Sequence, residues 1–379
     1  MDFSYSKTEQ LFLQMIRSFA ENEVKPLAAE VDEEERFPVE TVEKMAKLGL
    51  MGIPVPKQYG GAGGTIQMYT MAVEELSRVC ATTGVILSAH TSLCVDPILE
   101  HGTEEQKMKY LPKLASGEWL GAFGLTEPNA GTDAAMQQTT AVDAGDKWIL
   151  NGTKIFITNA ANADVFIVMA MTDKSLGNKG ISAFIVERSF KGFSIGKKEK
   201  KMGIRGSATC ELIFENCEVP KENLLGKMGE GFKVAMKTLD GGRIGIASQA
   251  LGIAQGAMDE TVKYTKERKQ FGKSIAQFQN TQFQMADLKT RVEAARLLVH
   301  SAAWKKDMGL PYSADAAMAK LYAAETAMDV TTKAVQFHGG YGYTREYPVE
   351  RMMRDAKITE IYEGTSEVQR MVIAAQLFK

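Results

Sequence analysis

The chain has 379 residues, of which 45% are hydrophobic and 24% charged, so it can bury a large core and is not a disordered protein. We expect two or three domains. Because 45 Lys and Arg residues nearly balance 47 Asp and Glu residues, the net charge of -2 creates no global field that would recruit nucleic acid or an anionic membrane.

No apolar run reaches the length of a bilayer span, and the N-terminal segment lacks the features of a signal or transit peptide. We therefore expect a cytoplasmic protein. The four cysteines and four histidines fit no metal-ligand spacing. This predicts incidental or buried thiols and no metal site.

The first segment, residues 1–120, is predicted to be an α-helical domain. Ser6 and Glu9 fit a capping box at the start of a helix, and an apolar stripe follows at helical spacing, formed by Leu11, Phe12, Met15, Ile16 and Phe19. Pro38 is predicted to open a second helix and Gly49 to close it. The glycine-rich stretch at residues 59–64 lacks the spacing of a phosphate loop and is predicted to be a turn.

The second segment, residues 121–228, contains short β-type runs separated by turn residues. Asn151-Gly152 lies between two such runs and predicts a hairpin turn. Cys210, Leu212 and Phe214 alternate with polar residues, as in a strand with one buried face. The pattern predicts an antiparallel β-domain.

In the third segment, residues 229–379, long helical patterns return, notably over 279–308 and 314–337. The small residues of 245–257 suit close packing between helices. The fold class predicted for the whole chain is α+β multidomain: an N-terminal helical domain, a middle β-domain and a C-terminal helical bundle.

A carboxylate precedes the last predicted helix, in the stretch IYEGTSEVQR at residues 361–370. Ser366 and Gln369 fit a capping box, which would place Glu363 on the loop that enters this helix. Gly364 can adopt backbone conformations that are closed to other residues and lets the chain approach a ligand closely.

Four segments together resemble the acyl-CoA dehydrogenase family. They are GLTEPNAGTDA at 124–134, FITNA at 156–160, ERKQFGK at 267–273 with QFHGGYGYTREYPVERMMRD at 336–355, and YEGTS at 362–366. The resemblance extends over essentially the whole chain. It implies FAD-dependent α,β-dehydrogenation of an acyl-CoA, with Glu363 removing the α-proton and the flavin accepting the β-hydride. The family's alternative position for the base is Gly242 in this chain, which has no side chain to accept a proton.

The resemblance also implies the residues that contact the flavin ring, and these are Phe123, Leu125, Thr126, Phe156, Thr158, Thr365 and Glu367. Phe156 and Thr158 are expected on one face of a strand, where they could pack against and hydrogen-bond a planar ligand. Residues near the substrate are implied to be Thr132, Asp240, Arg243 and Gly364.

The distal part of FAD is implied to be bound by Arg268, Gln270, Phe278, Gln279, Gln336, Gly339 and Gly340, largely for a neighbouring subunit. The guanidinium of Arg268 suits a pyrophosphate, and the two glycines allow close approach of the backbone. A site shared in this way implies a homo-oligomer, which in this family is usually a tetramer built as a dimer of dimers.

The short-chain, butyryl-CoA type is the closest resemblance, and the segment 83–93 contains no Arg or Lys that could hold a second carboxylate of a dicarboxylic substrate. The physiological direction, oxidation or reduction of crotonyl-CoA, stays open, as does operation in an electron-bifurcating complex. Electron-transferring flavoprotein is the partner implied. The alternatives are a branched-chain acyl-CoA dehydrogenase and, with less support, a flavin-binding relative that binds nucleic acid or acts as a scaffold. Burial beside Tyr362 is expected to raise the pKa of Glu363.

Overall fold

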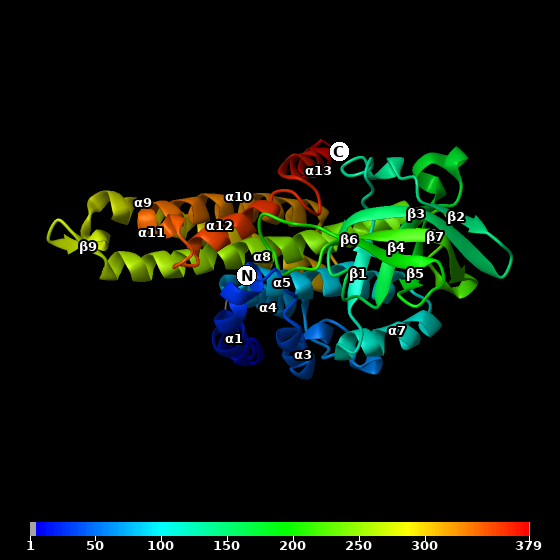
Figure 1. Cartoon of the computed structure of the whole chain (residues 1–379), viewed down its shortest axis with the longest axis horizontal. Helices are drawn as coiled ribbons and strands as arrows, with labels where there is room; N and C mark the ends of the chain where they lie inside the picture. Colours follow the sequence, from blue (N-terminus) through cyan, green and yellow to red (C-terminus); the bar gives the residue numbers. More distant parts are fainter. Residues whose placement is uncertain (1–4, 379) are drawn as a thin grey trace.

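The computed structural model describes residues 5–378 and shows an N-terminal group of helices, a β-sheet and a group of long helices, in chain order. In Figure 1 the N-terminal helices lie below, the sheet lies at one end, and the long helices extend away from it to the other end. Residues 1–4 and 379 lie outside the described part. The helix–sheet–helix order confirms the predicted fold class.

The N-terminal helices are α1 (Lys7–Phe19), α2 (Ala28–Glu33), α3 (Val39–Lys47), α4 (Ile66–Val79), α5 (Ala81–Ser88), α6 (Asp96–His101) and α7 (Glu104–Ser116). The predicted capping box is present at α1, where Ser6 and Glu9 satisfy each other's backbone N–H groups. Helix α3 follows Pro38 directly, and Gly49 adopts a left-handed conformation just after its end, as expected. A π-helical turn over Ala89–Val95 links α5 to α6.

Eight strands make one sheet in the order β6-β7-β3-β2-β4-β5-β8, with β1 paired to β4. Their bounds are β1 (Gly121–Gly124), β2 (Thr140–Asp143), β3 (Lys147–Ile157), β4 (Val165–Met171), β5 (Ile181–Glu187), β6 (Phe193–Lys198), β7 (Cys210–Pro220) and β8 (Leu224–Leu225). Most pairs are antiparallel, as predicted, but β1 and β2 each pair with β4 in parallel. The sheet is therefore mixed.

The predicted hairpin at Asn151-Gly152 is wrong, because both residues lie inside strand β3. A Cβ added to Gly152 would lie 2.5 Å from the hydroxyl oxygen of Thr139 and 2.7 Å from its Cα. Glycine is required here for close approach of another chain segment and not for a turn.

Strand β4 is buried along its whole length because its two faces belong to different cores. Val165, Ile167 and Met169 pack in one cluster with the buried side chains of α7. Phe166 and Val168 pack in a second cluster that other strands supply. The period-two alternation of a strand thus places the β-domain against the N-terminal helices while it keeps a core of its own.

The C-terminal helices are α8 (Gly231–Glu267), α9 (Gln279–Asp307), α10 (Ser313–His338), α11 (Gly340–Tyr343), α12 (Val349–Ile358) and α13 (Ser366–Leu377), with the short hairpin β9 (Lys269–Gln270) and β10 (Lys273–Ser274) at the tip beyond α8. Glycines of α8 allow α4 to pack closely. A Cβ on Gly252 would lie 2.3 Å from the carbonyl oxygen of Glu74, and one on Gly256 would lie 2.0 Å from that of Arg78. The predicted role of these small residues in helix packing is confirmed.

Two buried polar contacts connect the β-domain to the helical layers. The side-chain amide of Asn159, just after β3, donates to the carbonyl oxygens of Ile86 (3.1 Å) and Gly121 (3.3 Å). The carboxylate of Asp355, on α12, accepts a hydrogen bond from the backbone N–H of Ile204, in the loop between β6 and β7. These contacts fix the sheet relative to α5 and α12.

Within residues 5–378, no helix is long and apolar enough to cross a membrane. The same residues contain no group of three or more His, Cys, Asp or Glu side chains that could hold a metal ion. Cys80, Cys94, Cys210 and Cys217 are all free and buried, as predicted for incidental thiols.

Asp307→Ala is expected to lower the free energy of unfolding by about 1 kcal/mol, because Asp307 caps a helix from another layer. Its carboxylate accepts hydrogen bonds from the N–H groups of Ile66 (2.7 Å) and Gln67 (3.1 Å) in the first turn of α4. Urea unfolding followed by circular dichroism measures the effect. Asp315→Ala is the control, because the Asp315 carboxylate, in the first turn of α10, pairs with Lys305 and caps no helix from another layer within residues 5–378. Equal losses in both variants would contradict the capping role.

Candidate active site

The loop between α12 and α13 carries Glu363 and has a strained backbone. Glu363 has a φ of 52° and Gly364 a φ of 94°, so two successive residues adopt positive φ. For a glutamate this conformation costs about 1 kcal/mol or more and persists only where the surroundings impose it. Such strain is common at functional sites.

Helix α13 begins differently from the prediction. Thr365 is the capping residue, its hydroxyl accepting a hydrogen bond from the N–H of Val368, and Ser366 is already helical. The Ser366 N–H is used by the carbonyl oxygen of Glu360 (2.9 Å), so a capping box at Ser366 cannot form. The side-chain amide of Gln369 instead donates to the carbonyl oxygens of Gly364 (2.8 Å) and Glu363 (3.3 Å).

The carboxylate of Glu363 lies against the backbone of α8. A Cβ added to Gly242 would be 2.0 Å from Glu363 Oε2 and 2.9 Å from Leu93 Cδ2. Oε2 is buried and has no hydrogen-bond partner among the residues that the structure describes. A buried acceptor atom left without a partner is costly for stability, and here it is free to accept a proton.

Burial raises the pKa of Glu363 to about 7, although the nearby cations of Lys320 and Arg243 oppose this change. The direction agrees with the prediction from the sequence. A carboxylate with a pKa near neutrality is both substantially ionised and a stronger base than an exposed one, as general-base catalysis requires.

Arg243 and Asp240, which are one turn apart on α8, form an ion pair. Burial lowers the pKa of Arg243, although the negative charges of Asp240 and Glu363 favour its charged form. The hydroxyl of Ser313 also donates to Asp240, at 3.0 Å. The structure thus brings Asp240, Arg243 and Glu363 into one charged cluster.

Tyr362, which precedes Glu363, is held in place by a hydrogen bond to α8. The hydroxyl of Tyr362 donates to the amide oxygen of Gln249, whose amide nitrogen donates to the carbonyl oxygen of Ala81 at 3.1 Å. Tyr69, on α4, donates its hydroxyl to Ser88 Oγ at 3.2 Å. Burial raises the pKa of Tyr69, and the negative charge of Glu363 adds to this increase. Helices α4, α5 and α8 therefore surround the loop residues with packed side chains.

Several residues predicted to face a planar cofactor gather at the ends of β1 and β3. Phe123 and Leu125 are buried, and the carbonyl oxygen of Thr126 accepts a hydrogen bond from the N–H of Ile155 (2.9 Å). Phe156 is 60% exposed, which is unusual for a phenylalanine in the middle of the chain.

The prediction that Phe156 and Thr158 share a strand face is wrong. Strand β3 ends at Ile157, Phe156 has a φ of 58°, and Thr158 lies in the turn that follows. The left-handed conformation at Phe156 interrupts the alternation of a strand.

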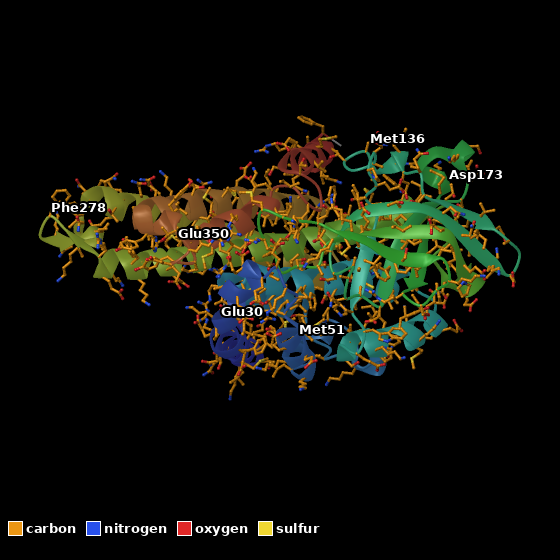
Figure 2. All side chains as sticks on the ribbon, viewed as in Figure 1. Glu30, Met51, Met136, Asp173, Phe278 and Glu350 are labelled. Atoms are coloured by element: carbon orange, nitrogen blue, oxygen red, sulfur yellow. The ribbon has the colours of Figure 1, made fainter. Side chains whose placement is uncertain are left out.

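The residues predicted for the distal cofactor contacts lie at the far tip of the long helices. Figure 2 shows Phe278 at the opposite end of the molecule from Met136 and Asp173, which mark the β-domain. The guanidinium carbon of Arg268, at the end of α8, lies 5.8 Å from the ring centre of Tyr341, so the end of α8 and helix α11 are neighbours. Exposed at this tip or at the adjacent end of α10 are Arg268, Gln270, Gln279, Gln336, Gly339 and Gly340.

The predicted site residues that have not yet been described do not lie at the tip. Thr132 is exposed on the loop after β1, whereas Thr365 and Glu367 belong to the first turn of α13. One chain therefore holds a site near Glu363 and a second group of predicted cofactor residues remote from it.

Two buried side chains around the loop, Lys320 and Gln249, were not predicted from the sequence. Lys320 donates from Nζ to the carbonyl oxygen of Gly364 at 2.6 Å. A single lysine in the alanine-rich segment 314–327 is the signal that could have revealed it.

Comparison with known proteins identifies the relatives of this chain. Family models described as the N-terminal, middle and C-terminal domains of acyl-CoA dehydrogenase match residues 6–118, 122–217 and 229–378. The chain is 65% identical over 379 residues to a short-chain specific acyl-CoA dehydrogenase of Clostridium acetobutylicum, with 100% of both chains covered.

Two solved structures are also very similar over their full lengths. Butyryl-CoA dehydrogenase from Megasphaera elsdenii has a TM-score of 0.98 and 53% identity, with 100% of each chain covered. A chain in the structure of the electron transferring flavoprotein of Acidaminococcus fermentans, determined in work on flavin-based electron bifurcation, has a TM-score of 0.99 and 58% identity, again with 100% of each covered. On these matches, which span nearly every residue, the chain belongs to the acyl-CoA dehydrogenase family.

Proposed function

We propose that this protein catalyses FAD-dependent α,β-dehydrogenation of short-chain acyl-CoA thioesters, converting butyryl-CoA to crotonyl-CoA. The observation that carries the proposal is the Glu363 carboxylate, which is held on a strained loop with a buried oxygen atom free to take up a proton. The same site catalyses the reverse reaction, because a catalyst lowers the barrier in both directions.

The chain supplies position and charge for removal of the α-proton. Glu363 accepts the proton, and its pKa of about 7 matches this task near neutral pH. Gly364 keeps the loop backbone close to the thioester, and the Asp240–Arg243 pair maintains a charged boundary beside the base. The hydrogen bond from Tyr362 to Gln249 fixes the position of the loop relative to α8.

FAD is the cofactor that we propose, and when bound it supplies the acceptor for the β-hydride. The exposed ring of Phe156 beside Thr126 and Leu125 offers the apolar and polar contacts that a flavin ring requires. Thr158, Phe123, Thr365 and Glu367 complete the proposed contacts to the ring, and Thr132 is proposed to contact substrate.

We further propose a homotetramer, built as a dimer of dimers, in which the tip residues bind the distal part of FAD held by a neighbour. The separation of Phe278 from the β-domain within one chain supports this sharing. Large apolar side chains exposed on α13 also support association, since Met371 is 66% and Leu377 73% exposed.

A short acyl chain is supported by the relatives above and by the crowded surroundings of Glu363, including Leu93 and the Tyr362–Gln249 contact. We propose electron-transferring flavoprotein as the partner that takes the electrons. The match to a chain in a structure of that flavoprotein supports this partner.

Anaerobic titration of the purified protein with butyryl-CoA tests the proposal. We expect the oxidised flavin absorbance to bleach with butyryl-CoA more readily than with octanoyl-CoA or isobutyryl-CoA. A protein that binds flavin but bleaches with none of these thioesters would contradict the proposed reaction.

Gly242→Ala is expected to lower kcat about 10²-fold without loss of flavin, because a methyl group at this position must displace the carboxylate of Glu363. Alanine is the better helix former by about 1 kcal/mol, so α8 should not be destabilised by the substitution itself. Steady-state kinetics and the flavin content per chain measure both effects. Unchanged kcat would show that the carboxylate does not have to lie against α8.

A further inference from the structure

We propose that Lys320 is a positioning residue for the catalytic base: it holds the loop through the carbonyl oxygen of Gly364, and its positive charge favours the ionised form of Glu363. This inference rests on the function proposed above. It assigns a role to a side chain that does not need to contact substrate.

Lys320 lies on α10 and is completely buried, with an exposed fraction of 0%. Its Nζ donates to the Gly364 carbonyl oxygen at 2.6 Å, and it forms no ion pair with any residue that the structure describes. A buried ammonium group without a carboxylate partner is expensive, so packing alone does not account for a lysine at this position.

The hydrogen bond acts on the part of the backbone that sets the direction of Glu363. The Gly364 carbonyl oxygen accepts from two sides, from Lys320 on α10 and from Gln369 on α13. These bonds fix the peptide groups after Glu363, where both residues have positive φ. A neutral donor and a charged donor therefore share one acceptor, and this allows their effects to be separated by experiment.

Other charged and titratable groups near Glu363 do not duplicate the role of Lys320. Arg243 on α8 is paired with Asp240, whereas Tyr69 on α4 and Tyr362 on the loop carry no positive charge. Lys320 is itself influenced by Arg243 and by three carboxylates, those of Glu363, Glu360 and Glu367. Burial lowers the pKa of Lys320 to about 8, with Glu363 opposing, so the ammonium form dominates at neutral pH.

The test compares the pH dependence of kcat/KM for butyryl-CoA in four variants. Lys320→Met removes the charge and the donor, Lys320→Arg keeps the charge, and Gln369→Met removes only the neutral donor. Lys333→Met removes a charge from the same helix about 20 Å along its axis and is the control. Lys320→Gln, which is neutral and polar, replaces the Met variant if that variant does not fold.

Because only the ionised carboxylate can accept a proton, loss of the Lys320 charge must move the acid limb of the profile to higher pH. For Lys320→Met we expect a shift of about one pH unit together with roughly 10²-fold lower kcat. Lys320→Arg should keep the acid limb at the wild-type position. Gln369→Met should lower kcat without moving the limb, and Lys333→Met should change neither.

An unmoved acid limb in both neutral Lys320 variants would overturn the electrostatic role. Unchanged kcat in those variants would overturn the positioning role. The infrared carbonyl band of protonated Glu363, assigned by its absence in Glu363→Gln, provides a readout without turnover. In Lys320→Met this band should persist to higher pH than in wild type, even if the wild-type protein fails to oxidise any acyl-CoA and the proposed function falls.

Discussion

Glu363→Gln is expected to lower the rate of flavin reduction by butyryl-CoA by roughly 10⁴-fold while flavin stays bound. Glutamine has nearly the same shape as glutamate but cannot accept the α-proton. The backbone contacts of the loop, made by Lys320 and Gln369 to carbonyl oxygens, do not involve the substituted group. Anaerobic stopped-flow absorbance measures the rate.

The matched control is Glu360→Gln, which makes the same chemical change in the same loop. The Glu360 carboxylate pairs with Lys357 at 2.7 Å. Its variant should reduce flavin at a rate close to that of wild type. Comparable rates in wild type and Glu363→Gln would show that another group removes the proton.

The same substitution should stabilise the protein at alkaline pH. The pKa of Glu363 is about 7 in the folded chain against a usual value of 4.5, so the folded state prefers the protonated form. Stability is therefore lost as the pH rises from about 4.5 through 7, by on the order of 3 kcal/mol. Glu363→Gln should be more stable than wild type at pH 8 and equal to it near pH 4. Lower stability of the variant at pH 8 would contradict this linkage.

Lys154→Met should be severely destabilising, by about 3–5 kcal/mol, because it leaves a buried carboxylate without its cation. Lys154 and Glu127 are 0% and 4% exposed at the side chain and form an ion pair at 2.7 Å. Lys154 Nζ also donates to the carbonyl oxygen of Leu125 (3.0 Å) and to Gln137 Oε1 (3.1 Å). We therefore expect the variant to lose flavin as well, since the neighbouring residues Leu125 and Thr126 are proposed to face the ring.

Strand β3 itself provides the control for this experiment. Lys147 pairs with Glu218 at the same distance of 2.7 Å, but both side chains are about one-third exposed. Lys147→Met should cost less than about 1 kcal/mol. Thermal melting and the flavin content of both variants measure the difference, and similar melting temperatures would show that burial of the Lys154 pair carries no special cost.

Local sequence signals predicted the parts of the fold that depend on neighbouring residues. The capping box at Ser6 and the end of α3 before Gly49 were correct because each motif is complete within a few residues. The prediction for Asn151-Gly152 was wrong for the opposite reason, since the glycine is required by the close approach of Thr139, which lies just before β2. The parallel pairing of β1 with β4 likewise joins segments about forty residues apart and leaves no local trace.

Some residues of the site could likewise be predicted from the sequence and others could not. The resemblance indicated Glu363 and its neighbours, and the apolar surroundings of Tyr362 were enough to predict a raised pKa. The second layer around the base was not predictable, because Lys320 and Gln249 reach it from helices that are distant in the sequence. The start of α13 was misplaced because Glu360 competes for the N–H that a capping box at Ser366 needs.

The contacts of Asn159 and Asp355 imply that activity and secondary structure are lost in a definite order when the protein is destabilised. The base belongs to the C-terminal helices, whereas most of the proposed flavin-facing residues belong to the sheet and its loops. The distance between the two groups therefore depends on the contacts between the layers. A shift of the sheet relative to the helices at these contacts would separate the proton acceptor from the hydride acceptor while every helix and strand stayed intact. Inactivation by mild denaturant or heat would then precede the loss of secondary structure, and the catalyst would be more fragile than the fold that carries it.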